Sequence, residues 1–248
     1  YDALSRTVEI LRQEDSLRPA VTVGNIDSYP NISAFLDAFF VEGSDVANVF
    51  QHEQYIFREG IPESGKVLQR QLRDLVAGYG RVARKLQDRN GRWHAIIQVH
   101  SETREGLGLS GFYYRKPSAA ELAVQVGLAL SRGASGVVYF LYSSGVELVR
   151  NGEGEVIQER LYEGLVTEQG DPSERYHAVK QINAQLQTLS PALQELHFHG
   201  GYSGGQLPRN ALIRTAHSDL NIGFFGTPSM MTHALFVNSR TDASLNAD

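Results

Sequence analysis

The chain has 248 residues, of which 42% are hydrophobic and 21% are charged, with a formal net charge of −5. This length is sufficient for one domain with its own core, or for one domain with a small appendage. Positive and negative side chains are interspersed, which argues against a nucleic-acid partner, and the absence of cysteine excludes disulfides, thiolate nucleophiles and cysteine-based zinc sites.

The first half of the chain alternates helical and strand patterns. Apolar residues recur three and four positions apart over residues 68–86, which predicts a long amphipathic helix. Short runs of β-prone residues between polar segments predict strands. In chain order we predict a helix over residues 4–17, a strand over 20–26, a short helix over 33–40, a strand over 45–50 and the long helix over 68–86.

The second half continues the alternation with clearer end signals. Ser118 and Glu121 have the spacing of a capping box, and Gly133 is placed to end that helix. Pro172 is predicted to take the first position of the last helix. The elements expected here are a strand over 93–99, a helix from 118 to 132, a strand over 136–142, a β-hairpin over 146–161 around Asn151-Gly152, and a helix from 171 that ends before Leu196.

These elements predict an α/β fold with four parallel strand–helix units, half of a TIM (β/α)₈ barrel, over residues 1–196. The strand at 136–142 is nearly all apolar, as in parallel strands that helices cover on both faces. An open doubly wound sheet is the alternative, but it usually has a Gly-rich first turn, and none follows these strands.

Residues 197–248 have a different texture and predict a β-rich tail or a partial β-sandwich. Short β-prone runs occur at 211–215, 220–225 and 234–238, separated by Gly, Pro and Ser. Gly200-Gly201 suggests a flexible surface turn. His197 and His199 would share one face of a strand, but no third ligand accompanies them, so we expect no metal site.

No membrane segment is expected, and the sequence leaves open whether a leader preceded its first residue. The most apolar stretch, residues 119–142, is interrupted by Glu121, Gln125 and Arg132, so it is not expected to span a membrane. The chain starts at Tyr1 rather than at Met and without a signal-peptide pattern, as at a processed or cut end. The sequence leaves the compartment open.

Three segments together resemble the C-terminal half of a glycoside hydrolase barrel of the large clan that includes the family 42 β-galactosidases. They are the block from Tyr114 to Leu122, the run over 129–142, and the segment over 164–176. The first two look like the helix before the eighth strand and that strand itself, and the third resembles the entry to the last helix. Residues 220–238 resemble the opening strands of the β-domain that follows such barrels.

The resemblance implies carbohydrate chemistry with two glutamates, an acid/base after the fourth strand and a nucleophile at the end of the seventh. On this alignment the first strand here is the family's fifth, so the strand with the acid/base is absent. Gln98 stands at the end of the matching seventh strand, where a glutamate is expected. An amide is unable to act as a carboxylate nucleophile, so the resemblance does not by itself imply catalysis.

Barrel enzymes carry their working residues on loops after the carboxyl ends of the strands. The carboxylates predicted for acid–base work are Glu53 and Glu102, although loops are polar in any protein and some carboxylates must lie there. No cofactor is expected. The residues predicted to bind substrate are Asp27, Gln51, His52, Gln98, His100 and Tyr142, with Tyr29, Tyr55, Tyr113 and Tyr114 as stacking platforms for sugar rings.

The segment from Gly60 to Lys66 has the spacing of a phosphate-binding loop. Val67 stands where Ser or Thr should hold Mg²⁺, and Pro62 removes a backbone donor, so we interpret the segment as a loop leading into a helix.

Four parallel strands alone would leave two sheet edges and one apolar face open. We therefore expect either another polypeptide that supplies the missing half or a homodimer or higher oligomer with an isologous contact. Three functions stay open: a glycosidase completed by association, a non-catalytic carbohydrate-binding or scaffold protein, and an inactive barrel fragment.

Overall fold

The computed structural model describes residues 2–15, 17–40, 48–87, 89, 91–105 and 114–242. The helices are α1 (Asp2–Glu14), α2 (Ile32–Phe39), α3 (Gly65–Gln87), α4 (Ala119–Leu130) and α5 (Glu174–Glu195), with short 3₁₀ turns at Ile26–Ser28 and Gly204–Gln206. The strands are β1 (Val21–Gly24), β2 (Val49–Glu53), β3 (Arg92–Gln98), β4 (Ser101–Glu105), β5 (Gly136–Phe140), β6 (Gly145–Arg150), β7 (Val156–Glu163), β8 (His197–Ser203), β9 (Leu220–Thr227) and β10 (Met230–Asn238).

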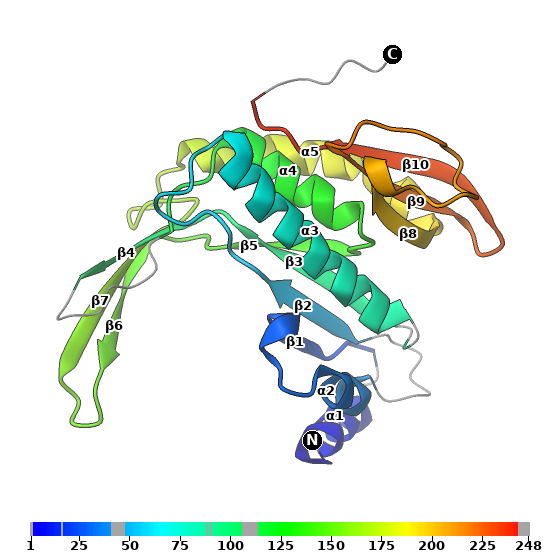
Figure 1. The fold of residues 1–248 in the computed structure, drawn as a ribbon. Coiled ribbons are helices and arrows are strands. Elements are labelled where there is room, and N and C mark those ends of the chain that lie inside the picture. Colours follow the sequence, from blue (N-terminus) through cyan, green and yellow to red (C-terminus); the bar gives the residue numbers. More distant parts are fainter. Residues whose placement is uncertain are drawn as a thin grey trace.

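The central feature is a parallel sheet of four strands in the order β1-β2-β3-β5. The order follows the chain, as the strand–helix alternation predicts, and it does not reverse as in a doubly wound sheet. Figure 1 shows α3 and α4 along one side of this sheet. The strands form an open sheet rather than a closed ring, and the α/β class is confirmed.

The main core lies between the sheet and the helices. Trp93, Ala95 and Ile97 alternate along β3 and are buried with Phe50 of β2. The apolar stripe predicted for the long helix is confirmed, because all six of its residues are buried against this side of the sheet: Leu68, Leu72, Leu75, Tyr79, Val82 and Leu86. Burial of an apolar side chain of this size stabilises the fold by about 1.5–3 kcal/mol.

The opposite side of the sheet is open at its β1 edge. Val21 and Val23, which alternate with Thr22 along β1, are 51% and 49% exposed. A parallel sheet normally has helices or further strands over both faces. This exposed apolar edge is therefore unusual for a parallel sheet.

The ends of α4 follow the sequence prediction, whereas the start of α5 does not. The capping box is confirmed, since Glu121 N–H donates to the Ser118 hydroxyl and the Glu121 carboxylate accepts from Ser118 N–H. Gly133 has φ +83° two residues after Ser131, the C-cap of α4, a left-handed conformation that suits the predicted helix stop. The prediction for Pro172 was wrong: Ser173 is the N-cap of α5, and Pro172 lies before the helix.

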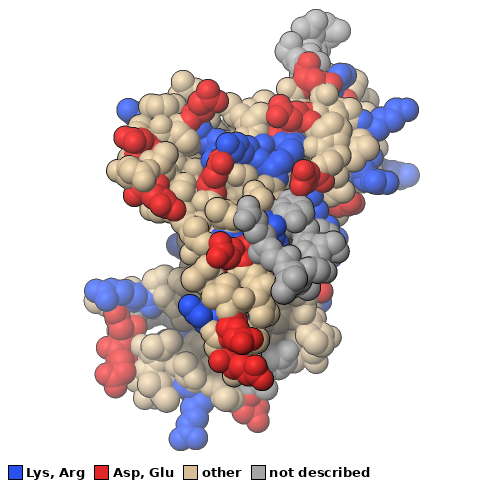
Figure 2. All heavy atoms as spheres, turned by 90° about the vertical axis from the view of Figure 1, so that its left-hand side faces the viewer, with Lys and Arg blue, Asp and Glu red and all other residues tan. Residues whose placement is uncertain are grey.

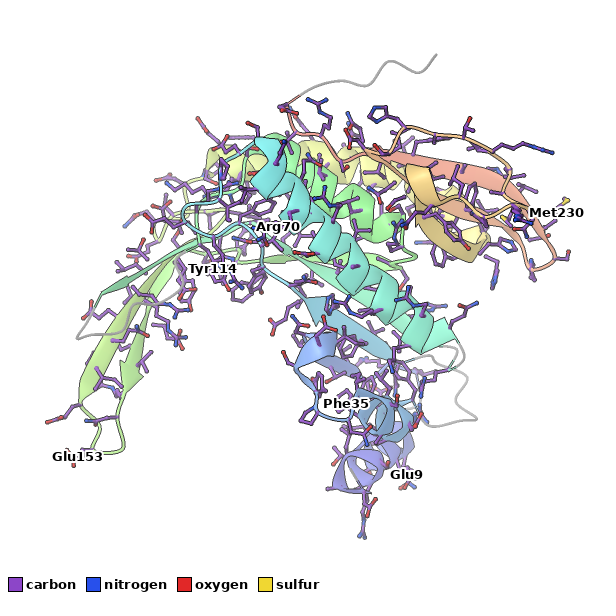
Figure 3. The ribbon with its side chains drawn as sticks, in the orientation of Figure 1. Glu9, Phe35, Arg70, Tyr114, Glu153 and Met230 are labelled. Atoms are coloured by element: carbon purple, nitrogen blue, oxygen red, sulfur yellow. The ribbon has the colours of Figure 1, made fainter. Side chains whose placement is uncertain are left out.

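Strands β4, β7 and β6 form a separate antiparallel sheet, which we call the arm. It projects from the carboxyl end of the parallel sheet, and Glu153 lies at its far tip (Figures 1 and 3). β6 and β7 pair around the Asn151 turn, where Asn151 Oδ1 accepts from the backbone N–H groups of Glu153 and Glu155. The sequence did not indicate β4, which is entirely polar.

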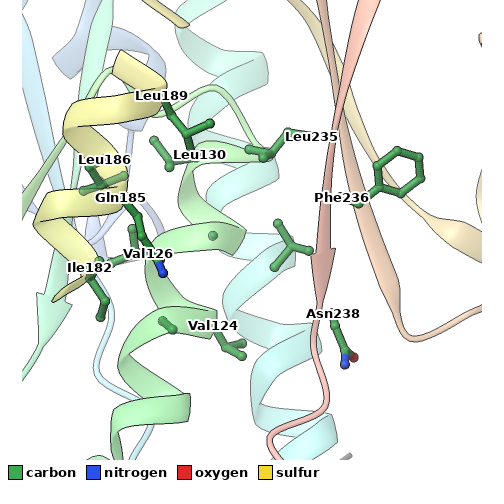
Figure 4. Close-up of a pocket in the computed structure, with 13 residues that line it drawn as sticks. Val124, Val126, Leu130, Ile182, Gln185, Leu186, Leu189, Leu235, Phe236 and Asn238 are labelled. Atoms are coloured by element: carbon green, nitrogen blue, oxygen red, sulfur yellow. The ribbon is translucent and has the colours of Figure 1, made fainter. Parts of the chain in front are cut away.

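The C-terminal part forms an antiparallel sheet, β10-β9-β8, that packs on α4 through β10. Two predictions here were wrong: Gly200 and Gly201 lie inside β8 rather than in a turn, and residues 211–215 form no strand. The strand predicted at 45–50 lies later, at Val49–Glu53, and residues 45–47 fall outside the described part. A pocket of about 260 Å³ lies between α4, α5 and β10, lined mainly by apolar side chains such as Leu130, Leu186 and Leu235 (Figure 4).

The surface carries both charge signs. Figure 2, seen from the side of the arm, shows Lys and Arg interspersed with Asp and Glu. Among the described helices, none is long and apolar enough to cross a membrane.

Candidate functional site

Aromatic side chains gather where the carboxyl ends of β2, β3 and β5 meet. We call Tyr55, His100, Tyr114, Phe140 and Tyr162 the aromatic cluster. The Tyr55 ring is stacked on Phe140, with 5.8 Å between centroids, and lies edge-on to His100 at 5.0 Å and to Tyr114 at 5.7 Å. His100 also lies 5.1 Å from Phe140 and 6.0 Å from Tyr162. The cluster thus joins the loops after two strands, the end of a third and the arm.

His100 anchors the cluster to the sheet. Its ring is buried, and its Nδ1 lies 2.9 Å from the carbonyl oxygen of Phe140. Burial lowers the pKa of His100, so the neutral ring predominates at pH 7. With Nδ1–H donating to that carbonyl, Nε2 carries the free lone pair. Burial likewise raises the pKa of Tyr55, whose hydroxyl remains a donor at any physiological pH.

Glu102 borders the cluster and is held by an arginine. Its residue is 4% exposed, and its carboxylate forms an ion pair with Arg104. Its backbone pairs with Tyr114, since Glu102 N–H donates to the Tyr114 carbonyl oxygen at 2.9 Å, and Tyr162 of β7 lies opposite it. Because it is buried and engaged, this carboxylate is poorly placed to reach a bound substrate.

Gln98 has a structural environment that explains why an amide stands there. Phe57 N–H donates to its Oε1 at 3.0 Å, and its Nε2 donates to the Phe57 carbonyl at 3.1 Å. The amide of Gln125 on α4 bonds the backbone of Gln98 in the same two-way manner, at 3.1 Å each. A carboxylate has no donor for the Phe57 carbonyl. Gln98 therefore fastens the loop after β2 to the end of β3.

Asp27 and His52 lie on the helix side of the sheet, away from the cluster. Asp27 accepts from Arg81 of α3 at 2.8 Å and 2.5 Å. His52 Nδ1 accepts from Ile26 N–H at 3.3 Å, and its ring lies edge-on to Tyr79 of α3. Burial lowers the pKa of His52 to about 4, so the ring is neutral. Both side chains serve contacts between the sheet and α3.

The remaining candidates lie on the open side or at the rim. Gln51 and Glu53 alternate with the buried His52 along β2 and are half-buried, on the opposite face. The Glu53 charge contributes to the raised pKa of Tyr55, so Glu53 borders the cluster. Tyr142 is 59% exposed just beyond β5. Tyr29 instead packs on Phe35, with ring centroids 4.4 Å apart, and Tyr113 lies outside the described residues.

Of the predicted residues, His100, Glu102, Tyr55 and Tyr114 come together, with Glu53 alongside. Asp27 and His52 do not face the cluster, whereas Gln98 pairs with Phe140 of the cluster across β3 and β5 but has its amide bonded to Phe57. Sequence reasoning missed Tyr162, whose hydroxyl donates to Glu147 at 3.0 Å, and Arg175, which donates to the Gly164 carbonyl at 2.9 Å and whose charge helps to lower the pKa of His100. The alternation along the hairpin was the one available signal for Tyr162.

The residues that the structure describes include no group of three or more His, Asp or Glu side chains placed to hold a metal ion.

No protein-family model matches the sequence. No curated protein matches it either. Among solved structures, the chain is similar to the β-galactosidase from the psychrophilic Marinomonas ef1, with 13% sequence identity and a TM-score of 0.47. The similar region covers 78% of this chain and 28% of the β-galactosidase chain.

Proposed function

We propose that this chain is a half barrel of the glycosidase type that binds carbohydrate at the aromatic cluster and does not hydrolyse it unaided. The four strands follow the chain order of a barrel sheet, and the cluster lies at their carboxyl ends, where barrel proteins bind ligands. The half-barrel description is part of this proposal.

The accessible faces of the cluster suit a sugar ring. Phe140 is 37% exposed, with Tyr55 stacked against it and the exposed Tyr142 beside it in sequence. Tyrosine combines an apolar face with a hydroxyl that can bond a sugar hydroxyl.

One observation above all argues against catalysis by the chain alone. The amide of Gln98 is bonded on both sides to the Phe57 backbone, so no carboxylate occupies the end of β3. Glycoside hydrolysis needs two carboxyl groups about 5 Å apart for retention or about 6.5–9.5 Å for inversion. Glu102 is buried against Arg104, which leaves Glu53 without a free partner carboxylate among the described residues of the cluster.

The test is a carbohydrate-binding screen with a matched hydrolysis assay. Oligosaccharide arrays followed by calorimetry should reveal binding that Tyr142→Ala and Tyr55→Ala weaken and that Tyr29→Ala, on the other side of the sheet, leaves unchanged. Fluorescence of Trp93 is a poor reporter, because the residue is 3% exposed. Absence of binding to every sugar on the array would refute the proposal.

A second candidate, a glycosidase completed by association, is favoured by Glu53, whose half-buried carboxylate lies on the open side of β2. A partner would have to supply the second carboxyl group. Release of nitrophenol from aryl glycosides, lost in Glu53→Gln and retained in Gln51→Ala, would support this function over binding alone.

A further inference from the structure

One face of the arm, which we call its apolar face, exposes four apolar side chains and also carries the exposed Glu159. Val146 lies directly opposite Leu161 on this face, and Leu148 lies opposite Glu159. Val146, Leu161 and Leu148 are 51%, 37% and 45% exposed, and Ile157, at the bulge beside them, is 40% exposed. Two-faced antiparallel sheets normally cover the apolar face and leave the polar one to solvent.

The opposite, polar face of the arm is covered in part, although its Glu147 is exposed. Glu102 and Gln158 are 4% and 5% exposed there. Arg160 connects this face by bonding Gln158 at 3.2 Å and Glu147 at 3.3 Å, and the Tyr162 hydroxyl also bonds Glu147. Apart from β4, no described helix or strand packs closely against β6 or β7, and Figure 1 shows the arm standing clear of the body. Within the described part of the chain, the exposed apolar face is therefore left without an intramolecular cover.

A second apolar surface lies on the same molecule, at the open edge of the parallel sheet. Val21 and Val23 are half-exposed on β1, whose outer edge carries no strand among the described residues. An unpaired edge flanked by apolar side chains is a site for association.

We propose that the arm of one copy packs its apolar face against the β1 surface of a second copy, and that the second copy's arm does the same in return. Such an exchange is an isologous contact, in which each surface meets the other across a two-fold axis. It covers both open surfaces of both copies with one arrangement.

The apolar area is of the size that a stable dimer uses. The half-exposed Val, Leu and Ile side chains on the two surfaces present on the order of 400 Å² per copy, close to the apolar share of the ~800 Å² that each partner of a standard interface buries. Exposed apolar patches of a few hundred Å² often mark surfaces that bind another molecule. A second copy of the chain therefore has enough apolar surface to cover both exposed surfaces in a stable dimer.

Sedimentation across micromolar concentrations tests the proposal directly. We expect a reversible dimer, and Leu148→Glu or Leu161→Glu should weaken it at least about tenfold, the effect of desolvating a charge at a central contact. The control is Leu212→Glu, because Leu212 is 51% exposed but lies on neither surface. Unchanged circular dichroism shows that each variant folds. A monomer throughout, or a dimer that ignores both arm substitutions, overturns the proposal.

Cross-linking identifies which surfaces meet. The chain has no cysteine, so single engineered thiols report one contact each. Leu148→Cys and Val21→Cys chains, mixed and oxidised, should form a mixed disulfide dimer, whereas each variant alone should not. A disulfide dimer of Leu148→Cys alone would place arm against arm and overturn the proposed pairing. None of these readouts depends on whether the chain binds a sugar.

Discussion

The amide at Gln98 allows a sharp test of how this region is built. In Gln98→Glu, the oxygen that replaces Nε2 faces the Phe57 carbonyl at a site where the donor lay 3.1 Å away. The carbonyl keeps the Arg115 N–H as a second donor at 3.0 Å, but the new carboxylate is fully buried beside it. An uncompensated buried charge destabilises a protein by about 3–5 kcal/mol, which corresponds to a melting temperature lower by about 10 °C for a chain of this size.

The pH dependence distinguishes this cause from simple misfit. In the Gln98→Glu variant, a protonated carboxyl group can donate to the Phe57 carbonyl and accept from Phe57 N–H, as the amide does. The folded state therefore raises the pKa of the introduced carboxyl above the ordinary value of about 4.3. The folded state then binds more protons than the unfolded chain. The loss relative to the natural chain should be small, about 1 kcal/mol, below pH 4, and it should grow as pH rises above about 4.3.

Urea denaturation of both proteins at several pH values measures this difference, and effects common to both chains cancel. Gln51→Glu is the matched control, because Gln51 is half-buried on the open side of β2 and the same change there should cost under about 1 kcal/mol. If Gln98→Glu has the same free energy of unfolding as the natural chain at pH 7, the account of Gln98 is refuted. A decrease in stability that does not vary with pH would refute it too. We also expect Gln98→Glu to gain no glycosidase activity, since Phe57 holds that side chain.

Three other predictions concern the fold. Ser118→Ala removes the capping-box acceptor of α4 and should destabilise the chain by about 1 kcal/mol, read from the urea midpoint. In Gly127→Ala the new Cβ would lie 2.8 Å from a Val237 methyl carbon, so the C-terminal sheet should dock less well by about 1–3 kcal/mol, and Val237→Ala in the same chain should restore most of the loss. The pKa of His52 is about 4 in the folded chain against an ordinary value of 6.5, so the unfolded chain binds the proton more readily. The free energy of unfolding should therefore fall by about 3 kcal/mol as pH drops from 6.5 to 4. His52→Asn should make stability depend less on pH in this range, and an unchanged dependence would contradict the burial argument.

The elements that the sequence predicts well are those whose pattern is determined by one partner surface. The stripe of α3 repeats at helical spacing because a single sheet face covers it. The missed strand β4 has no apolar pattern at all. It is a strand because β7 pairs with it and the backbone of its Glu102 pairs with that of Tyr114, contacts between residues too far apart in sequence for a local pattern to show.

The two glycines of β8 show how a residue type can mislead. Gly200-Gly201 looks like a turn because glycine is the usual turn residue. In the fold, a Cβ on Gly201 would lie 2.1 Å from the Ser131 carbonyl oxygen, so the absence of a side chain lets β8 approach the end of α4. Glycine is favoured both where two backbones approach closely and where the chain turns, so its presence alone does not distinguish the two.

The site residues were predicted because they follow the ends of strands. In the structure some of them lie on the helix side of the sheet and others lie on the side of the aromatic cluster. His52 and Glu53 are neighbours at the end of β2, but successive strand residues point to opposite faces, so one packs on α3 while the other borders the cluster. Asp27 found its partner in Arg81, 54 residues away. Position at the end of a strand does not by itself tell which residues contact α3 and which border the aromatic cluster.

The arm connects the two proposals in a way that can be measured. Along β7, Leu161 belongs to the proposed contact between copies and Tyr162, the next residue, belongs to the aromatic cluster. Successive residues of a strand are held by the same backbone hydrogen bonds, so fixing one face restricts the other. If association orders β7, sugar affinity should be higher in the dimer, and by linkage the sugar must tighten the dimer by the same factor. Calorimetry at protein concentrations below and above the dimer midpoint tests this coupling, with Leu148→Glu held monomeric as the reference. Equal sugar affinity in the dimer and in that monomer would show that the arm serves association alone.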